Sequence, residues 1–289
     1  PAGTPIPTLN GTDFGIGDNQ TGTVTDTATA TIVEGQVTIT QSPSSADRGD
    51  NLSGAVAVNV TASEVTGQNT APITVELVFE GLAGESPTTL GTETVRLGAG
   101  ESQTVTFDGL DPIPNATTAS DGEPVTLRVD ANRDSDSTTT DLSHSVQNAV
   151  DFAVFDGQSA VDLLAGTYPE EVTIDTDNAT IAGAGTSVTT IDGNVTVTGD
   201  NNTLENFTID GNLTLDGANN DASNVTVTGS TNTQTIGTDQ SPGGGNVFVN
   251  ADATLTDVEA ATVAVSSGTA TISSSTIGTL SLSGNADAD

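Results

Sequence analysis

The sequence predicts an all-β protein, and two patterns in its 289 residues support this prediction. β-Branched residues alternate with polar residues between Gly, Asn and Asp turns along most of the chain, which is typical of half-buried strands. No stretch shows a convincing helical period, and the closest, residues 158–165, would make two turns of helix at most. We therefore expect an extended N-terminal segment (residues 1–34), a β-sandwich (35–145) and a stacked solenoid (146–289).

The N-terminal segment contains a strand pattern with a period of two. Thr occupies every second position from residue 23 to residue 31, and mostly small apolar residues take the other face. The residues of this candidate assembly strand are Thr23, Val24, Thr25, Thr27, Ala28, Thr29, Ala30, Thr31 and Ile32. Two interpretations stay open. It is either an edge strand of its own domain or a detachable strand that completes a neighbouring subunit's sheet by β-augmentation.

Residues 35–145 show short, regularly spaced strands separated by turn residues, as in a β-sandwich. The predicted strands are residues 36–40, 55–61, 73–79, 89–97, 103–107 and 124–130. The runs 74–81, 93–107 and 125–132 resemble the immunoglobulin-like domain called CARDB, which is common in archaeal and bacterial surface adhesins. The resemblance implies a spacer or binding module without catalytic residues.

Residues 130–141 carry oxygen side chains at the spacing of a calcium loop. The candidate Ca²⁺ ligands are Asp130, Asn132, Asp134, Asp136 and Asp141. Ser135 stands where such a loop needs Gly, and the last ligand is Asp rather than the longer Glu. The sequence therefore leaves two interpretations, a Ca²⁺ site and an acidic solvated loop.

The chain has a single histidine, His144, and no cysteine. A histidine-based triad, a multi-histidine metal site, a disulfide framework and a thiolate metal site are therefore excluded. We expect His144 to be a surface or linker residue.

The C-terminal half contains a short internal repeat. A spacing of 18 residues matches Gly199 with Gly217 and Asn206 with Asn224, and a spacing of 17 fits the later turns. A repeat this short, with β-branched positions and Gly or Asn corners, predicts stacked turns that bury one continuous apolar row. We expect the Asn side chains at equivalent corners to form amide ladders and the Asn backbone to tolerate left-handed angles.

The start of this half contains Gly-Thr-Tyr-x-Glu (residues 166–170) followed by Ile-x-Gly-x-Gly (181–185). These elements resemble the opening turns of the right-handed parallel β-helices of the pectin-lyase-like superfamily. The full fold prediction is therefore all-β: an Ig-like β-sandwich plus a right-handed parallel β-helix (solenoid), with an extended N-terminal strand. A fold of this kind does not by itself define an activity.

The pectin-lyase-like superfamily includes lyases, esterases and hydrolases, and the resemblance implies sites that combine carboxylates with basic residues. The predicted β-helix contains no Arg, Lys or His. Asp192, Asp210 and Asp216 are candidate carboxylates for glycoside hydrolysis. However, Asp192 and Asp210 occupy the same repeat position beside a Gly, as a turn requires. With one Tyr and no Trp, the chain also lacks an aromatic platform for sugars. We therefore expect that it is not an enzyme.

The charge is strongly one-sided: the chain has 39 Asp and Glu but only four Lys and Arg, which gives a formal net charge of −35. The basic residues are Arg48, Arg96, Arg128 and Arg133, all in the first half. Such a surface repels itself at ordinary ionic strength, whereas at molar salt the screening length falls to about 3 Å. The composition is typical of an extreme halophile. Nucleic acid and anionic membranes are improbable partners, because both require clustered basic residues.

N-glycosylation sequons are frequent. They begin at Asn10, Asn19, Asn51, Asn59, Asn115, Asn178, Asn194, Asn201, Asn206, Asn212 and Asn224. This density favours an exported glycoprotein with N-linked glycans, located outside the cell or on its surface. We find no signal peptide, transmembrane run or sorting tail in the sequence, and we expect a processed form or a fragment.

The sequence as a whole predicts an extracellular structural or adhesive surface protein of an extreme halophile. We expect it to be a self-assembling, pilus-like filament or a surface-layer subunit, whose partners are further copies of itself, other surface proteins or glycans. Two alternatives stay open: a viral or cellular spike that binds a receptor or glycan, and a polysaccharide-degrading β-helix enzyme.

Overall fold

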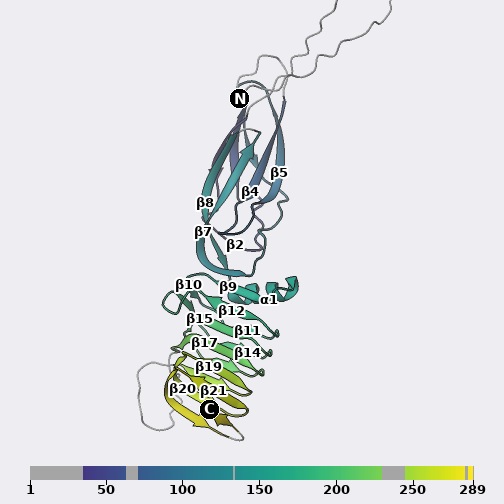
Figure 1. The fold of residues 1–289 in the computed structure, drawn as a ribbon. Coiled ribbons are helices and arrows are strands. Elements are labelled where there is room, and N and C mark those ends of the chain that lie inside the picture. The colour runs from purple at the N-terminus through teal and green to yellow at the C-terminus, as the bar shows by residue number, and fades with distance from the viewer. Residues whose placement is uncertain (1–34, 63–70, 133, 230–244, 284–285, 289) are drawn as a thin grey trace, which may run out of the picture.

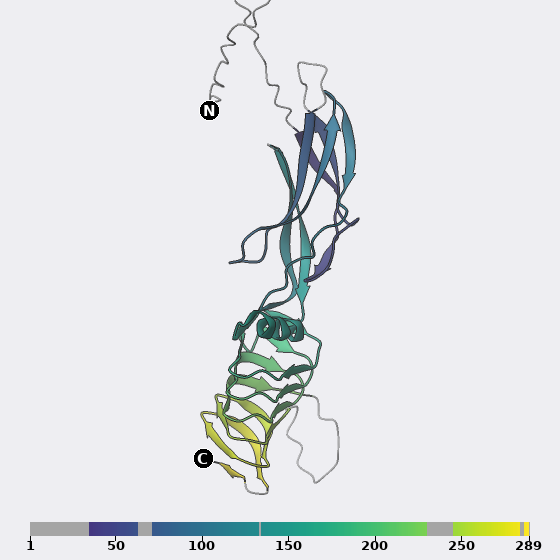
Figure 2. The same cartoon turned by 90° about the vertical axis from the view of Figure 1, so that its right-hand side faces the viewer.

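The computed structural model describes residues 35–62, 71–132, 134–229, 245–283 and 286–288. The described residues form two β-rich modules that lie end to end with one helix between them (Figures 1 and 2). We call residues 35–144 the N-terminal module and residues 160–288 the coil module. Most described residues are in strands, which confirms the all-β prediction.

Some sequence predictions lie outside the described residues. These are the candidate assembly strand, Thr23 to Ile32, and the sequons at Asn10 and Asn19. Within the described ranges, no helix has the length and apolar character needed to cross a membrane.

The N-terminal module consists of two sheets around one core. Its strands are β1 (Gly35–Gln41), β2 (Ser45–Asp47), β3 (Ala57–Ala62), β4 (Ala71–Phe79), β5 (Thr88–Leu97), β6 (Ser102–Thr106), β7 (Thr118–Ala131) and β8 (Asp134–His144). One antiparallel sheet has the order β1-β3-β6, and the other has β5-β4-β7-β8, with β2 beside β8 in parallel. All the predicted strands of this module are present, and β2 and β8 are additional.

The alternating sequence pattern explains which face of each strand is buried. In β7, Val125, Leu127 and Val129 are buried, and the residues between them are more exposed. Because successive side chains of a strand point to opposite faces, this alternation directs one row into the core. Phe79 and Phe107 lie in the same core and are among its largest fully buried side chains.

Helix α1 (Val146–Asp156) follows directly on β8 and was not predicted. Ser145 is its N-cap and accepts a hydrogen bond from Asn148 N, while Gly157 ends it with a left-handed backbone angle (φ 70°). The helix buries a short apolar stripe against β7, β9 and β11. The weak helical candidate at residues 158–165 is wrong, because this segment forms β9, in which Val161 and Leu163 are buried at alternate positions.

The coil module consists of short strands that wind in successive turns. They are β9 (Ala160–Leu163), β10 (Gly166–Tyr168), β11 (Val172–Ile174), β12 (Thr180–Gly183), β13 (Thr189–Ile191), β14 (Val195–Val197), β15 (Thr203–Ile209), β16 (Leu213–Leu215), β17 (Asn220–Val227), β18 (Asn246–Val249), β19 (Ala253–Thr256), β20 (Glu259–Val265), β21 (Thr269–Ser273), β22 (Thr276–Leu282) and β23 (Asp287–Ala288). Each turn pairs in parallel with the next, and the turns follow one another down the module (Figure 1).

The pairing register confirms the predicted repeat. Val195 pairs with Leu213 and Ile209 with Val227, which is the spacing of 18 residues read from the sequence. Ala253 pairs with Ala270, which is the spacing of 17. Stacking equivalent positions puts the inward side chains of successive turns in rows, and these rows form one continuous apolar core.

Gly and Asn form the corners of the coil, as predicted. A Cβ on Gly211 would lie 2.1 Å from the carbonyl oxygen of Gly193 in the preceding turn, so only Gly fits there. Asn206 and Asn224 have φ of 65° and 50°, and Nδ2 of Asn224 donates to Oδ1 of Asn206 at 2.8 Å. These observations confirm both the left-handed Asn angles and the amide ladder.

Candidate functional site

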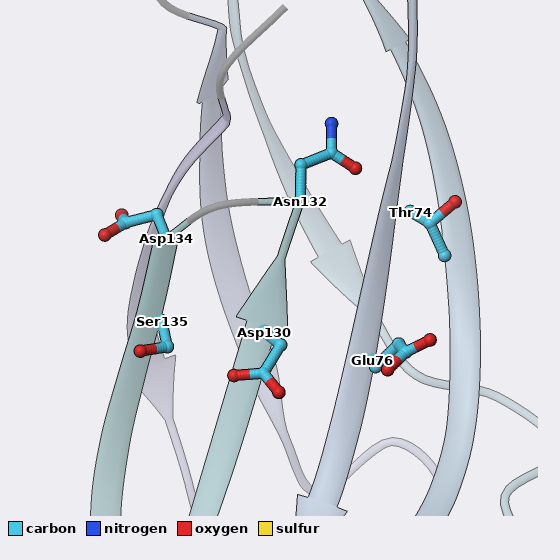
Figure 3. A pocket seen from close by; sticks show the side chains of 6 residues that line it. All are labelled: Thr74, Glu76, Asp130, Asn132, Asp134 and Ser135. Atoms are coloured by element: carbon cyan, nitrogen blue, oxygen red, sulfur yellow. The ribbon is translucent and has the colours of Figure 1, made fainter. Parts of the chain in front are cut away.

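A cavity of about 400 Å³ lies at the far end of the N-terminal module, at the tip of the β7–β8 hairpin. Figure 3 shows its lining residues, which are Thr74, Glu76, Asp130, Asn132, Asp134 and Ser135. Three of them are predicted Ca²⁺ ligands. Their carboxylates already have partners: Oδ2 of Asp130 accepts from Arg128, and Oδ2 of Asp134 accepts from the backbone N–H of Val37 at 2.8 Å.

Residues 134–141 of the candidate calcium loop lie in the extended strand β8, which pairs with β7 as a hairpin. Seven residues of strand separate Asp134 from Asp141 by about 23 Å, and this odd number puts the two side chains on opposite faces. Asp136 accepts from the backbone N–H of Ile39. The five predicted ligands, including Asp130 and Asn132, therefore do not converge. Nowhere in the described ranges do three or more acidic or His side chains form a metal-binding group.

The two modules are joined by continuous β-pairing. Thr118 and Ala119 of β7 pair in parallel with Asp162 and Leu163 of β9, so one ladder crosses from the N-terminal module into the coil. Tyr168 adds a second link, because its buried hydroxyl lies 2.9 Å from the carbonyl oxygen of Ala119. Burial, followed by nearby carboxylates, raises the pKa of Tyr168 well above its ordinary value, so the hydroxyl stays a donor.

Helix α1 is held by a carboxylate from the first turn of the coil. The two carboxylate oxygens of Glu170 accept from the backbone N–H groups of Val146 (2.6 Å) and Gln147 (3.1 Å). These N–H groups have no partner within the helix, and a negative charge is favourable at this end. The Gln147 side chain also bonds to the backbone N–H and carbonyl of Thr173 in β11. These hydrogen bonds therefore connect the N-terminal turn of the helix to the coil module.

A second cavity, of about 290 Å³, lies where the modules meet, and we call it the junction cavity. Its lining residues come from both modules and from α1: Asp47, Arg48, Ser120, Asp121, Ser143, His144, Ser145, Asn148, Thr167, Tyr168, Pro169 and Glu170. Pairing of β2 with β8 places Asp47 opposite Ser143, and the backbone N–H of Arg48 donates to the Ser143 carbonyl. Arg48 directly follows Asp47, and His144 directly follows Ser143, so the parallel pairing places Arg48 and His144 side by side.

Arg48 is a buried cation, only 6% exposed. Its guanidinium donates to Glu85 Oε1 at 2.5 Å and to the carbonyl oxygen of Pro114 at 3.0 Å, and it lies 5.9 Å from the ring centre of Phe79. A buried charge needs such partners to offset its lost hydration. Sequence analysis did not single out Arg48, because nothing in its local sequence indicates that it is buried.

His144 was expected to be a surface or linker residue; it is the last residue of β8, just before helix α1, and is only 3% exposed, so the surface interpretation is wrong. It pairs with Ser120 of β7. Its Nε2 lies 3.0 Å from the carbonyl oxygen of Ala116. Burial is the main cause that lowers the pKa of His144, and the neighbouring Arg48 lowers it further.

The described sequons lie on both modules. Asn51, Asn115, Asn178, Asn194, Asn201 and Asn224 are exposed, and Asn59, Asn206 and Asn212 are half-buried. Several coil sequons also stabilise the corners, since Nδ2 of Asn212 donates to Oδ1 of Asn194 at 3.2 Å. The structure thus gives these asparagines a structural role in the coil, and their glycosylation stays a prediction.

The candidate carboxylates of the coil lie at its exposed corners. The register that pairs Ile191 with Ile209 puts Asp192 and Asp210 at equivalent corners, as the repeat predicted. Asp216 accepts from Asn250 Nδ2 one turn away. Asp221, which the sequence analysis did not name, lies half-buried in β17; burial raises its pKa, and its Oδ1 has no partner among the described residues. The coil sequence supplies no Arg, Lys or His to accompany these carboxylates.

Comparison with known proteins gives no family for the chain. No protein-family model matches it, and no curated protein matches it. A β-glucosidase from Listeria innocua is 19% identical over 38% of this chain and 16% of its own, with a TM-score of 0.25. A β-glucosidase from Erythrobacter marinus is 18% identical over 39% of this chain and 15% of its own, with a TM-score of 0.25. The catalytic domain of a GH87 α-1,3-glucanase is 12% identical over 89% of this chain and 67% of its own, with a TM-score of 0.23.

Proposed function

We propose that this chain is a structural or adhesive protein of the cell surface, in which the two modules form one stiff stalk. The observation that carries the proposal is the junction. Strand pairing, the Tyr168 hydroxyl and the Glu170 carboxylate all tie the coil to the elements that precede it. Modules joined by a flexible linker would move independently, whereas a shared ladder transmits orientation from one module to the next.

We propose the finer fold on the same basis. Two sheets around one core and the CARDB-like runs support an Ig-like sandwich for the N-terminal module. Parallel turns at a spacing of 17–18 residues and the opening motif support a right-handed parallel β-helix of the pectin-lyase-like kind. In this assignment both modules serve as spacers, and neither performs a catalytic step.

We further propose that the protein works outside the cell in concentrated salt and carries N-linked glycans. The net charge of −35 and the frequent sequons support this location. At molar salt the acidic surface is screened and holds water and cations, while the packed β-core keeps the stalk folded. The proposed partners are further copies of the chain, other surface proteins and glycans.

Assembly is the proposed role of the N-terminal segment. Residues 23–32 would add a strand to the sheet of a neighbouring subunit and join stalks into a pilus-like filament or a surface layer. The alternation of Thr with small apolar residues supports this proposal.

Electron microscopy of the native protein in molar salt tests the assembly. We expect filaments or sheets with a regular subunit repeat, and their loss when residues 23–32 are deleted. The matched control replaces these residues with a Gly/Ser segment of equal length, which keeps the reach of the chain but not the strand pattern. Intact assemblies after the deletion would exclude this strand as the joint.

A further inference from the structure

The last described turn of the coil leaves its apolar core open. Leu280 and Leu282 of β22 are 46% and 50% exposed. The register pairs them with Val263 and Val265 of the preceding turn, which are 0% and 1% exposed. Both leucines therefore continue the inward rows of the coil, and they are exposed because no further turn among the described residues covers them.

The two ends of the coil differ. At its first turn, helix α1 adds a stripe of four buried residues to the same apolar core: Val146, Ala149, Val150 and Ala153. At the other end, drawn in yellow in Figure 1, β22 pairs in the described part of the chain with β20 alone. Its outer edge therefore offers backbone N–H and C=O groups to a further strand, and a solenoid end of this kind requires a cover to stay soluble.

The candidate assembly strand, residues 23–32, has the sequence pattern of a coil strand. Strands β19 and β21 place Thr between an inward Ala and an inward Leu or Ile, as in Ala253-Thr-Leu255 and Ala270-Thr-Ile272. Residues 29–32, Thr-Ala-Thr-Ile, are identical in sequence to residues 269–272 of β21. Stacking these residues on an open turn would continue its inward rows with Ala and Ile.

The chain enters the N-terminal module at the end of the stalk opposite the open turn. β1 begins at Gly35, where a Cβ would lie 3.8 Å from Cβ of Ala131, the last residue of β7. The other end of β7 pairs with the coil, and its 14 residues span about 46 Å. Residues 23–34 reach at most about 43 Å, so the assembly strand cannot extend to the open turn of its own chain. A strand that covers this turn must come from a second copy.

We propose that residues 29–32 of a second copy of this chain bind as an added parallel strand on the outer edge of β22, where Ala30 and Ile32 cover Leu280 and Leu282. The proposal rests on the proposed assembly role of residues 23–32 and names the surface that receives them. Because the donated strand and its site lie at opposite ends of the stalk, the contact is heterologous, and its repetition builds an open filament.

Binding of a peptide tests the site directly. The probe is a fluorescein-labelled peptide of residues 21–34, and fluorescence anisotropy measures its binding in molar KCl. The protein is the full-length variant whose residues 23–32 are replaced by a Gly/Ser segment, which leaves the coil end free of the chain's own strand. We expect saturable binding, and a loss of about tenfold or more for a scrambled peptide of the same composition, which lacks the alternation.

A charge at the open end should remove the contact. Leu282→Asp puts a carboxylate in place of an apolar side chain that the added strand would cover, so we expect binding to weaken by about tenfold or more. The matched control is Phe155→Asp on helix α1, which changes another exposed apolar side chain, 88% exposed, and should leave binding unchanged. Circular dichroism checks that both variants are folded.

Cross-linking tests the register and the partner. The chain has no cysteine, so a Thr31→Cys copy can be mixed with a Ser281→Cys copy and treated with a short bismaleimide. The proposed pairing places these two positions opposite each other, and we expect a dimer that contains one copy of each. Cross-links between two Ser281→Cys copies alone would show that two coil ends meet, and would overturn the proposal.

The outcomes separate this site from the assembly role on which it rests. Filaments that are lost on deletion of residues 23–32 but survive Leu282→Asp would keep the strand as the joint and overturn the coil end as its site. Peptide binding to a protein that forms no filaments would support the site and contradict the filament. Absence of peptide binding to the folded Gly/Ser variant would overturn the proposal, whether or not Leu282→Asp folds.

Discussion

The Glu170 carboxylate at the start of helix α1 gives the sharpest test of how the junction is held. Glu170→Gln keeps the size and one acceptor oxygen but loses the charge and the second acceptor, so one of the two helix N–H groups loses its partner. Hydrogen bonds to charged groups contribute about 1.5–3 kcal/mol, and molar salt screens the interaction of the charge with the helix dipole. We therefore expect the free energy of unfolding to fall by about 1.5 kcal/mol.

Urea unfolding in molar KCl provides the assay. Tyr168 is the single Tyr in a chain without Trp, so tyrosine fluorescence reports on the junction while circular dichroism reports on all strands. The matched control is Glu171→Gln at the next residue, an exposed side chain, for which we expect a change below about 0.5 kcal/mol. If Glu170→Gln and Glu171→Gln behave alike, the carboxylate does not hold the helix, and the proposed tie is wrong.

Gly211→Ala would put a methyl group 2.1 Å from the Gly193 carbonyl oxygen, so we expect a loss of about 3 kcal/mol in chemical denaturation, against a negligible loss for the exposed Asp210→Ala. The pKa of His144 is lowered in the folded protein, where it faces Arg48, Asp47, Glu85, Asp121 and Glu170. The unfolded chain therefore binds the proton more readily, so the stability contributed by the neutral ring is complete above about pH 6.5 and is lost as pH falls toward the lowered value. His144→Gln should remove this part of the pH dependence measured by thermal unfolding, and an unchanged profile would refute the assignment. Finally, the melting temperature should rise steeply between about 0.1 M and 1 M KCl as the net charge of −35 is screened; a flat dependence would contradict the role given to the acidic surface.

Sequence patterns predicted the fold where an element buries one apolar face. The rows that include Val195 and Leu213 repeat at a fixed spacing, and the same spacing sets the pairing of the turns. Strand β8 could not be predicted in this way, because residues 134–141 are all Asp, Ser or Thr. Its extended state depends on pairing with β7 and on hydrogen bonds that the carboxylates of Asp134 and Asp136 accept from backbone N–H groups of β1.

The sequence contains capping signals for helix α1, but the residues between the caps do not show a clear helical pattern. Ser145 and Gly157 are typical capping residues, but the helix is short and its buried stripe consists only of Ala and Val. The junction cavity had no local signal. Arg48 and His144 are 96 positions apart in the sequence and become neighbours only through the pairing of β2 with β8, and the coil residues Tyr168 and Glu170 reach them only after β7 pairs with β9. Tertiary pairing of this kind is not contained in periodicity or motif spacing.

The central claim is that the two modules form one stiff stalk, and a distance distribution across the junction tests it most directly. Because the chain has no cysteine, spin labels can be placed cleanly at Thr139→Cys in β8 and Thr271→Cys in β21, both exposed positions. Thr173→Cys with Thr271→Cys gives a control pair within the coil. Pulsed electron paramagnetic resonance in molar salt should give a single distribution across the junction, as narrow as that of the control pair. A distribution much broader than the control would show that the modules move independently and would contradict the stalk.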